Sequence, residues 1–323
     1  MPSGITHMMI SQKTLDYIAD EDASNILQSE RGPFMLGCVS PDLPYMTLLD
    51  TKVWENRKGI ADDFHYKRTN EIPLEGLRLT KKYLQNNETN IANTLFAFYV
   101  GYASHIVADG IIHPYVRDKV GDYEVAATAH RTLEMKLDVL LADFFFDQEI
   151  NNINFHDELS WIKDCANQEE IFKSFSSFID SVYQTQVSPE EIKKWLSTMD
   201  MVFDITTGKF PFWYQKLLGD SGLAFNNVEN ILSEKEKLTT LTLPIDYKEK
   251  SLSTNYMQKE KVDFFEDVLP HYFSVFSRFI LDAYSFVYAD GPEDAIHLPP
   301  INLDTGRIIG QNLENKPKFL ELA

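Results

Sequence analysis

His105, Asp109 and His113 are the residues of this sequence whose types and spacing most directly suggest chemistry. They are spaced four apart along the chain. On an α-helix, each would therefore lie about 40° around the axis from the one before it. All three side chains would project from one side of that helix, one turn above another. Imidazole nitrogens and carboxylate oxygens at this spacing are a common way for a helix to offer paired ligands to zinc.

His130 and Glu134 repeat the same spacing a short distance further on. A single pair of this kind is more often a hydrogen-bonded histidine on the surface or in the core. Two observations favour a metal centre here. The two pairs would lie on helices joined by a short connection, and such helices are usually antiparallel neighbours. The first pair is also embedded in apolar residues, where an unpaired carboxylate would be costly to bury: Phe96, Phe98, Tyr99, Ile106, Val107, Ile111 and Ile112.

With residues nearer the start of the chain, the pattern resembles the bacterial zinc-dependent phospholipase C family. The wider superfamily of this family includes the P1-type nucleases. Its members carry an N-terminal His, then an Asp and a His in the intervening loops, then the two helical motifs. The resemblance covers roughly residues 1–140, and the following residues meet this order: His7, Asp42, His65, His105, Asp109, His113, His130 and Glu134.

The resemblance implies an all-α fold in which these residues bind about two to three zinc ions. The first zinc would be held by Asp42, His65, His105 and Asp109. The second would be held by His113, His130 and Glu134. The third would be bound by His7, with Asp109 as a bridging ligand. The best-known members complete this third site with an N-terminal tryptophan, and this sequence has none near His7.

The activity implied by the resemblance is phospholipase C-like hydrolysis of a phospholipid head-group phosphodiester. Asp42 is the candidate catalytic residue, as a ligand that also accepts a proton from the attacking water, although a role as ligand alone is equally compatible with the sequence. The alternatives are a P1-type phosphodiesterase or nuclease and a metal-binding protein without catalytic activity. Glu134 favours the phospholipase branch, because the P1-type nucleases usually carry Asp at that position.

Several aromatic residues and histidines lie outside this ligand set. The aromatic residues near Asp42 and His65 could line a head-group pocket or simply belong to the core. They are Tyr45, Trp54, Phe64 and Tyr66. The other tryptophans are expected to be packing residues or part of a surface that touches lipid: Trp161, Trp195 and Trp213. The remaining histidines have no matching partners and are expected on the surface or in the core: His156, His271 and His297.

The composition limits the classes of partner. The 49 acidic residues against 30 basic ones give a formal net charge of -19, which disfavours a nucleic-acid partner because phosphate binding relies on Lys and Arg. Transient contact with a membrane surface is compatible with the proposed substrate. Cys38 and Cys165 form no Cys-x-x-Cys motif, so a thiolate zinc site is not expected. The start of the sequence lacks the features of a signal peptide, and we expect a cytoplasmic protein or one exported by a non-classical route.

Helical periodicity dominates the elements that must position these residues. We expect a multi-helix bundle with a zinc-binding core over 1–150 and a helical C-terminal region over 151–323. The expected helices are Ser11–Gln28, Glu75–Leu84, Asn93–Val116, Tyr123–Asp147, Gln168–Gln184, Pro189–Asp204, Pro211–Leu218 and Lys259–Tyr288. Three parts are expected to be irregular, namely Ser29–Asn70 for the most part, Leu238–Tyr256 and the tail from Asp290.

Some boundaries carry more specific signals. Ser188 is a candidate N-cap, and Glu191 would complete a capping box. Pro270 predicts a kink within the long C-terminal helix. Thr239–Leu243 is the one strand candidate.

Overall fold

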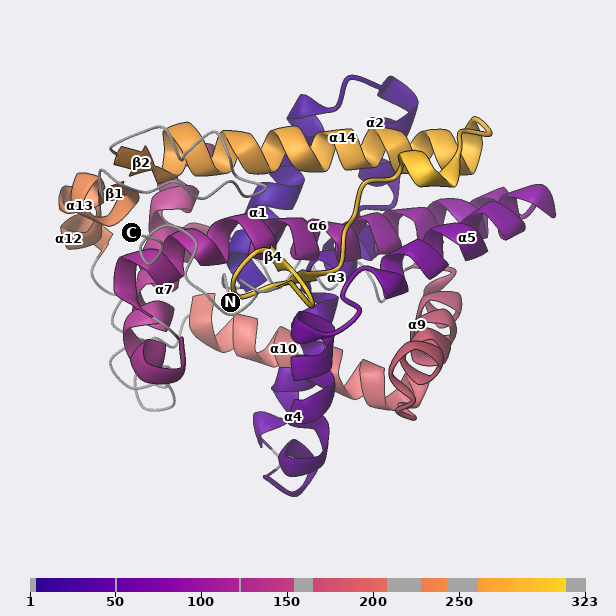
Figure 1. Cartoon of the computed structure of the whole chain (residues 1–323), viewed down its shortest axis with the longest axis horizontal. Coiled ribbons are helices and arrows are strands. Elements are labelled where there is room, and N and C mark those ends of the chain that lie inside the picture. The colour runs from indigo at the N-terminus through magenta and orange to yellow at the C-terminus, as the bar shows by residue number, and fades with distance from the viewer. Residues whose placement is uncertain are drawn as a thin grey trace.

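The computed structural model of this chain is an all-α assembly of helices, with two small antiparallel strand pairs among the residues that it describes, and it confirms the expected fold class (Figure 1). It describes residues 4–49, 51–121, 123–153, 165–207, 228–242 and 261–311. The expected helix Pro211–Leu218 and most of the stretch Leu238–Tyr256 lie outside these residues.

Helix α6 (Thr89–Val120) runs through the middle of the molecule and organises the core (Figure 1). Nearly every residue of α6 from Ala92 to Asp118 is buried. The chain packs α3 (Arg31–Val39), α5 (Glu71–Gln85) and α14 (Leu269–Tyr288) around it. Length and composition alone would allow α6 to cross a membrane. Its most apolar window, however, is 100% buried inside the fold, as expected for a core helix.

The remaining helices surround this centre. The N-terminal part of the chain contributes α1 (Gly4–Thr14), η1 (Leu15–Tyr17), α2 (Glu21–Ser29), η2 (Ser40–Leu49) and α4 (Thr51–Tyr66). After α6 come α7 (Tyr123–Phe146), η3 (Ile150–Asn152), α9 (Gln168–Tyr183), α10 (Pro189–Thr207), α12 (Val228–Ser233) and α13 (Lys235–Thr239). Two short elements flank α14, namely η7 (Phe264–Val268) and η8 (Glu293–Ala295).

The strands are short. β1 (Thr240–Thr242) pairs with β2 (Lys261–Asp263), and Leu241 lies opposite Val262. The expected strand near Thr239–Leu243 is thus confirmed over its described residues. In the tail, β3 (Ile301–Asn302) pairs with β4 (Arg307–Ile308). The tail was expected to be irregular; in its described part, this hairpin and the short 3-10 helix η8 depart from that expectation.

Glycine allows α3 and α6 to cross at close range. A Cβ on Gly37 would lie 2.1 Å from the carbonyl oxygen of Phe98, and one on Gly101 would lie 2.2 Å from that of Phe34. Both obstacles are backbone atoms, which cannot rotate away as a side chain can. This crossing brings the chain that leaves α3 toward the C-terminal half of α6.

The prediction that Ser29–Asn70 is mostly loop is wrong. The segment folds into α3, the 3-10 turns of η2 and α4. Pro33 lies in the first turn of α3, where a missing N–H costs no hydrogen bond, and Pro41 and Pro44 lie in η2. The prolines therefore mark where helices begin and change type rather than where helix is absent.

The predicted kink at Pro270 is also wrong. Lys261–Asp263 is strand β2, a π-turn follows at Phe264–Val268, and Pro270 lies in the first turn of α14. The side chain of Asp263 accepts hydrogen bonds from the amides of Phe265 and Glu266 and so caps the start of the π-turn. Proline is favoured at this place because its lost amide would have no helical partner.

The expected N-terminal helix over Ser11–Gln28 is likewise divided. α1 ends at Thr14, and a new helix begins at Glu21, where the Asp20 side chain accepts a hydrogen bond from the amide of Ala23. Ser188 does cap α10, because its hydroxyl accepts from the amide of Glu191 at 3.2 Å. The Glu191 carboxylate pairs with Arg57 of α4 at 2.6 Å, and so it fastens α10 to α4.

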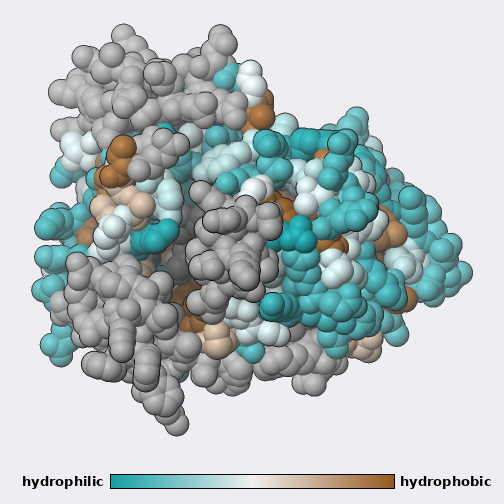
Figure 2. All heavy atoms as spheres, turned by 90° about the horizontal axis from the view of Figure 1, so that it is seen from below, coloured by the Kyte–Doolittle hydropathy of each residue, from teal (hydrophilic) through white to brown (hydrophobic). Residues whose placement is uncertain are grey.

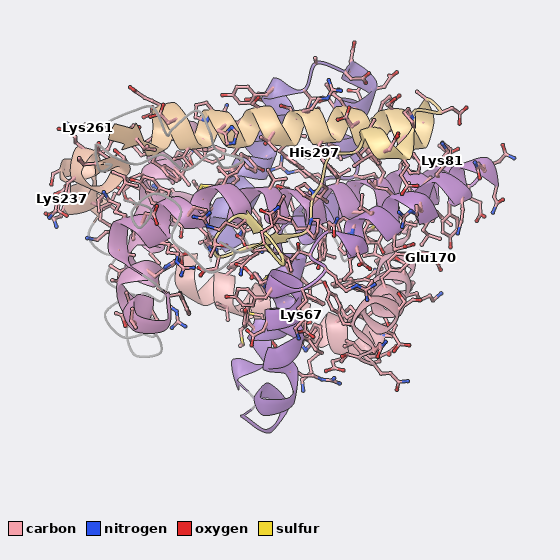
Figure 3. The ribbon with its side chains drawn as sticks, in the orientation of Figure 1. Lys67, Lys81, Glu170, Lys237, Lys261 and His297 are labelled. Atoms are coloured by element: carbon pink, nitrogen blue, oxygen red, sulfur yellow. The ribbon has the colours of Figure 1, made fainter. Side chains whose placement is uncertain are left out.

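Polar contacts also join the helices at the periphery (Figure 3). Lys81 of α5 donates to the carbonyl of Phe286 on α14 at 2.8 Å, and Tyr83 donates to Glu170 of α9 at 3.0 Å. The face seen in Figure 2 is largely hydrophilic where residues are coloured, with small separated apolar patches. The expected division into 1–150 and 151–323 stays a prediction, although α9 and α14 both pack on α5 and α6.

Candidate metal centre

The C-terminal half of α6 presents His105, Asp109 and His113 into the interior. Their exposed fractions are 0%, 0% and 3%. The i, i+4 spacing places the three side chains on one face, as the sequence predicts. His105 Nε2 lies 3.3 Å from one oxygen of Asp109, and His113 Nε2 lies 3.9 Å from the other. Asp109 therefore faces an imidazole with each oxygen.

Helix α1 brings His7 to this face. Its ring stacks on that of His105 with centroids 3.9 Å apart, and its Nε2 lies 3.2 Å from Asp109 Oδ1. The neighbouring Thr6 donates a 2.6 Å hydrogen bond to Asp138 of α7. This contact fastens α1 to α7 next to the centre.

Asp42 of η2 and His65 of α4 also lie against the ligands on α6. His65 Nε2 lies 3.3 Å from Asp42 Oδ1 and 3.7 Å from Asp109 Oδ2. Asp42 Oδ1 also lies 3.8 Å from His105 Nε2. Because η2 and α4 are helical, both residues are held by regular elements rather than by the loops that the sequence led us to expect.

His130 and Glu134 of α7 complete the cluster beyond His113. His130 Nε2 lies 3.1 Å from Glu134 Oε1, and His113 Nε2 lies 3.6 Å from the same oxygen. α6 and α7 are neighbours, as the short connection between them predicts. The structure thus brings together all eight residues that the sequence singled out.

The candidate ligand atoms fall into three groups, within each of which all atoms lie no more than 4.8 Å apart. The groups are His7, Asp42 and His105; His65, His105 and Asp109; and His113, His130 and Glu134. The last group matches the second set implied by the resemblance. The other two groups share His105. The residues that the resemblance assigns to the first and third zinc ions therefore form one continuous cluster.

Many of these buried atoms make no hydrogen bond. They include both ring nitrogens of His7 and His130, both oxygens of Asp109, Asp42 Oδ1 and His113 Nε2. Buried polar atoms without partners are rare and costly in folded proteins. Here they converge on one another at 3 to 4 Å, which is the arrangement expected when each directs a lone pair at a shared cation. The donor set of imidazoles and carboxylates fits zinc.

Three of the histidines are oriented by main-chain carbonyls. The Nδ1 atoms of His65, His105 and His113 lie 2.7, 2.9 and 2.9 Å from the carbonyl oxygens of Ala61, Cys38 and Leu303. Such a partner holds the proton on Nδ1 and leaves the Nε2 lone pair for a metal. The sequence could not indicate these partners, because a carbonyl group carries no residue signature.

The buried groups shift the pKa of one another. Burial lowers the pKa of His7 to about 4, and the charge on His105 adds to this effect. Burial would lower the pKa of His105 too, but the carboxylates of Asp109 and Asp42 outweigh it and raise that pKa to about 9. The pKa of Asp109 is held well below its usual range by His105 and His113 despite the burial.

Asp42 and Glu134 follow the same physics. Burial opposes ionisation of both, yet His105 and His65 lower the pKa of Asp42. The imidazoles of His113 and His130, which face Glu134, contribute to its lowered pKa. The carboxylates of the centre are therefore ionised at neutral pH, which is the form that binds a cation.

Aromatic rings surround the histidines. The ring of Tyr45 lies 5.6 Å and that of Tyr66 lies 6.4 Å from the ring of His65. Phe64 is completely buried and packs against Tyr102, so it is a core residue. Tyr123, which the sequence did not single out, lies 5.2 Å from His130, and its hydroxyl accepts hydrogen bonds from Arg131.

The other residues singled out by type lie apart from the candidate ligand groups. Trp195 is a core residue, 2% exposed. His297 is exposed, and His271 is half-buried on α14. His156, Trp161 and Trp213 lie outside the described residues, as does the side chain of Trp54.

Comparison with known proteins identifies the family. The family model of zinc-dependent phospholipase C matches residues 6–187, a stretch that includes all eight candidate ligands. Searches of curated proteins and of solved structures returned no match. More than half of the chain is matched, and the chain belongs to the zinc-dependent phospholipase C family.

Proposed function

We propose that this member of the zinc-dependent phospholipase C family hydrolyses a phospholipid head-group phosphodiester at the cluster of eight buried imidazoles and carboxylates. The observation that carries the proposal is that the candidate ligand atoms converge, and that many of them make no hydrogen bond although they are buried. Membership in the family supports zinc as the ion and phosphodiester hydrolysis as the reaction class.

The interatomic distances suggest which residues would hold which ion. We assign His113, His130 and Glu134 to one zinc site, since their ligand atoms form a separate group. The larger cluster of His7, Asp42, His65, His105 and Asp109 would hold the rest of about two to three zinc ions. Asp109 offers one oxygen toward His7 and the other toward His65 and His105, which suits a carboxylate that bridges two ions.

Zinc at these positions would lower the pKa of a bound water toward about 7 and neutralise charge on the phosphoryl oxygens. The protein's own part in the reaction is to orient the ester and to move a proton. We assign to Asp42 the role of accepting the proton from the attacking water. It is ionised, it is 5% exposed, and its Oδ1 makes no hydrogen bond.

The proposed reaction balances in a single displacement. The oxygen of water forms a bond to phosphorus, and the bond between phosphorus and the glycerol oxygen breaks. Asp42 takes one proton from the water, the departing glycerol oxygen takes one proton from solvent, and Asp42 then releases its proton to solvent. The products are a phosphorylated head group and a diacylglycerol. Tyr45 and Tyr66 flank His65 and would contact the head group, since aromatic faces attract quaternary ammonium groups.

One assay tests the substrate class. Zinc-loaded protein would be incubated separately with phosphatidylcholine vesicles and with single-stranded DNA, and the release of phosphocholine and of mononucleotides measured. We expect phosphocholine and no mononucleotides, in keeping with the net charge of -19, which opposes nucleic acid. Release of mononucleotides alone would replace the proposal by a P1-type nuclease. Release of neither product from a protein that binds zinc would favour a non-catalytic metal-binding role.

A further inference from the structure

The tail of the chain forms a hairpin that lies against the candidate metal centre. We define the strap as Leu298–Ile308, which follows α14 and contains β3 and β4. In Figure 1 it descends from the end of α14 and crosses the middle of α6. The strap lies more than 100 residues beyond the stretch 6–187 that matches the family, so the family match does not account for it.

The corner between α4 and α5 holds the start of the strap. The Thr69 hydroxyl donates to the carbonyl of Ile301 at 2.9 Å and accepts from the amide of the same residue at 3.1 Å. The side-chain amide of Asn70 donates to the carbonyl of Leu298 at 2.8 Å. Thr69 is completely buried. It therefore holds the main-chain amide and carbonyl of Ile301 away from solvent.

The main chain of Leu303 then joins two candidate ligands. Its amide donates to the carbonyl of His65 at 2.9 Å, and its carbonyl lies 2.9 Å from His113 Nδ1. His65 lies on α4 in one ligand group, and His113 lies on α6 in another. One residue of the strap therefore touches both parts of the centre.

The turn of the strap is itself fixed. Asn302 Oδ1 accepts from the amides of Asp304 and Thr305 at 3.0 and 3.2 Å. Asp304 forms an ion pair with Arg117, one turn beyond His113 on α6. Leu303 is 0% exposed. These contacts leave the Leu303 carbonyl little freedom to turn away from His113.

We propose that the strap orients a ligand of the metal centre. Thr69 and Asn302 are positioning residues that hold Leu303, and the carbonyl of Leu303 in turn orients His113. The carbonyl of Leu303 keeps the His113 proton on Nδ1, which presents Nε2 to the ion. The inference rests on the metal centre of the proposed function. It adds that residues far beyond the family match set the affinity of the site that contains His113.

The test compares Thr69→Val with Thr80→Val. Thr80 is also completely buried and donates a hydroxyl hydrogen bond, but within α5 to the carbonyl of Gly76. Zinc affinity would be measured by competition with a chromophoric chelator. Partners of metal-bound histidines typically contribute 10- to 100-fold to affinity. We expect Thr69→Val to lose about 10-fold in affinity for one zinc, the ion at the site that contains His113, while Thr80→Val retains wild-type affinity for every ion.

Two further variants separate positioning from folding. Thr69→Ser keeps the hydroxyl and should restore affinity. Asn302→Ala removes the turn contacts and should weaken zinc in the same direction as Thr69→Val. The absorption spectrum of the Co²⁺-loaded protein should change for Thr69→Val and Asn302→Ala but not for Thr80→Val.

These measurements distinguish a failure of the strap proposal from a failure of the proposed hydrolysis. Equal zinc affinity and equal cobalt spectra for wild type, Thr69→Val and Asn302→Ala would overturn the strap and leave the proposed function intact. A weakened site in both variants of a protein that hydrolyses no phosphodiester would support the strap and contradict the proposed reaction. A wild-type protein that binds no zinc would overturn both.

Discussion

Main-chain groups of the protein orient three of the imidazole rings at the centre. Main-chain carbonyls hold His65, His105 and His113 by Nδ1, and the buried carboxylates stay ionised because the imidazoles face them. A bound cation would offset further the cost of burying these charges. At the scale of single residues, the structure therefore makes metal binding and ligand geometry inseparable.

The residue-scale prediction concerns His130, which is completely buried at the edge of the cluster. Replacing it by alanine removes one of the three ligands of its group. We expect His130→Ala to bind about one zinc fewer per chain and to lose roughly 100-fold or more in phosphodiester hydrolysis, since even partners of ligands contribute 10- to 100-fold.

The control for this variant is His297→Ala. His297 is exposed, and Figure 3 shows it on the segment that follows α14. Its loss should leave both zinc content and activity unchanged. Full zinc content and full activity in His130→Ala would remove that residue from the metal centre.

A second residue-scale prediction concerns pH. Burial raises the pKa of Glu30, whose carboxylate accepts a hydrogen bond from Thr94 at 3.0 Å. A raised pKa in the folded state means that the charged form is disfavoured there, so stability falls as pH rises through that value. Glu30→Gln should raise the unfolding temperature at neutral pH, and the gain should vanish at acidic pH.

The matched variant is Glu149→Gln, because Glu149 is exposed and the replacement makes the same change in net charge. It should move the unfolding temperature little at either pH. A gain for Glu30→Gln that is equally large at acidic and neutral pH would show that its effect does not come from the titration of Glu30.

Between elements, the close crossing of α3 and α6 positions the centre. The chain leaves α3 directly into η2, which carries Asp42, while the carbonyl of Cys38 at the end of α3 orients His105. A wider crossing would move both contacts away from α6. The glycines at the crossing are therefore part of how the ligands are placed.

The element-scale prediction tests this crossing with one methyl group. A Cβ on Gly101 would lie 2.2 Å from a backbone oxygen, whereas one on Gly59 of α4 would meet nothing within 4 Å. We expect Gly101→Ala to destabilise the protein by about 1–3 kcal/mol or more. Gly59→Ala should stabilise it by about 0.5–1 kcal/mol, because alanine favours helix. Chemical denaturation of both variants measures the difference, and equal stability of the two would contradict the close crossing.

Helical periodicity predicts the parts of the fold whose burial pattern is local. The expected Asn93–Val116, Tyr123–Asp147 and Gln168–Gln184 correspond to α6, α7 and α9 within a few residues. The same periodicity predicts the ligand pairs on α6 and α7. Two errors fall at prolines in the first turns of helices, Pro33 and Pro270, because the sequence alone does not distinguish a helix start from a break. The third divides the expected helix Ser11–Gln28, where Asp20 caps a new helix within a continuous apolar pattern.

The rest of the centre could not follow from spacing. His7, Asp42 and His65 are distant in sequence from α6, and the family resemblance, rather than periodicity, indicated them. Neither periodicity nor the family resemblance could predict the contact of the strap with the centre. This contact is made by the main chain of Leu303, and the strap lies outside the family match. Contacts made by backbone atoms between distant segments depend on the packing of the whole chain.

At the scale of the whole molecule, the centre is a concentration of buried charge in the interior of a strongly acidic protein. An ion that binds the folded state alone stabilises it by about 2.7 kcal/mol when present at 100 times its Kd. We expect zinc removal with EDTA to lower the unfolding temperature by several degrees and excess zinc to restore it.

This effect has an internal control in the ligand variants. The shift on EDTA treatment should be smaller in His130→Ala, which lacks one group of ligands, and unchanged in His297→Ala. Equal unfolding temperatures of the wild-type protein with and without zinc would show that the ion does not bind the folded state preferentially.

The measurement that tests the central claim most directly is the zinc content of the wild-type protein. The protein would be purified without chelators, and its zinc determined by elemental analysis alongside its concentration. Eight converging ligands in three groups predict about two to three zinc ions per chain. A content below one zinc per chain, unchanged after incubation with excess zinc and removal of the unbound ion, would contradict the metal centre and the hydrolysis built on it.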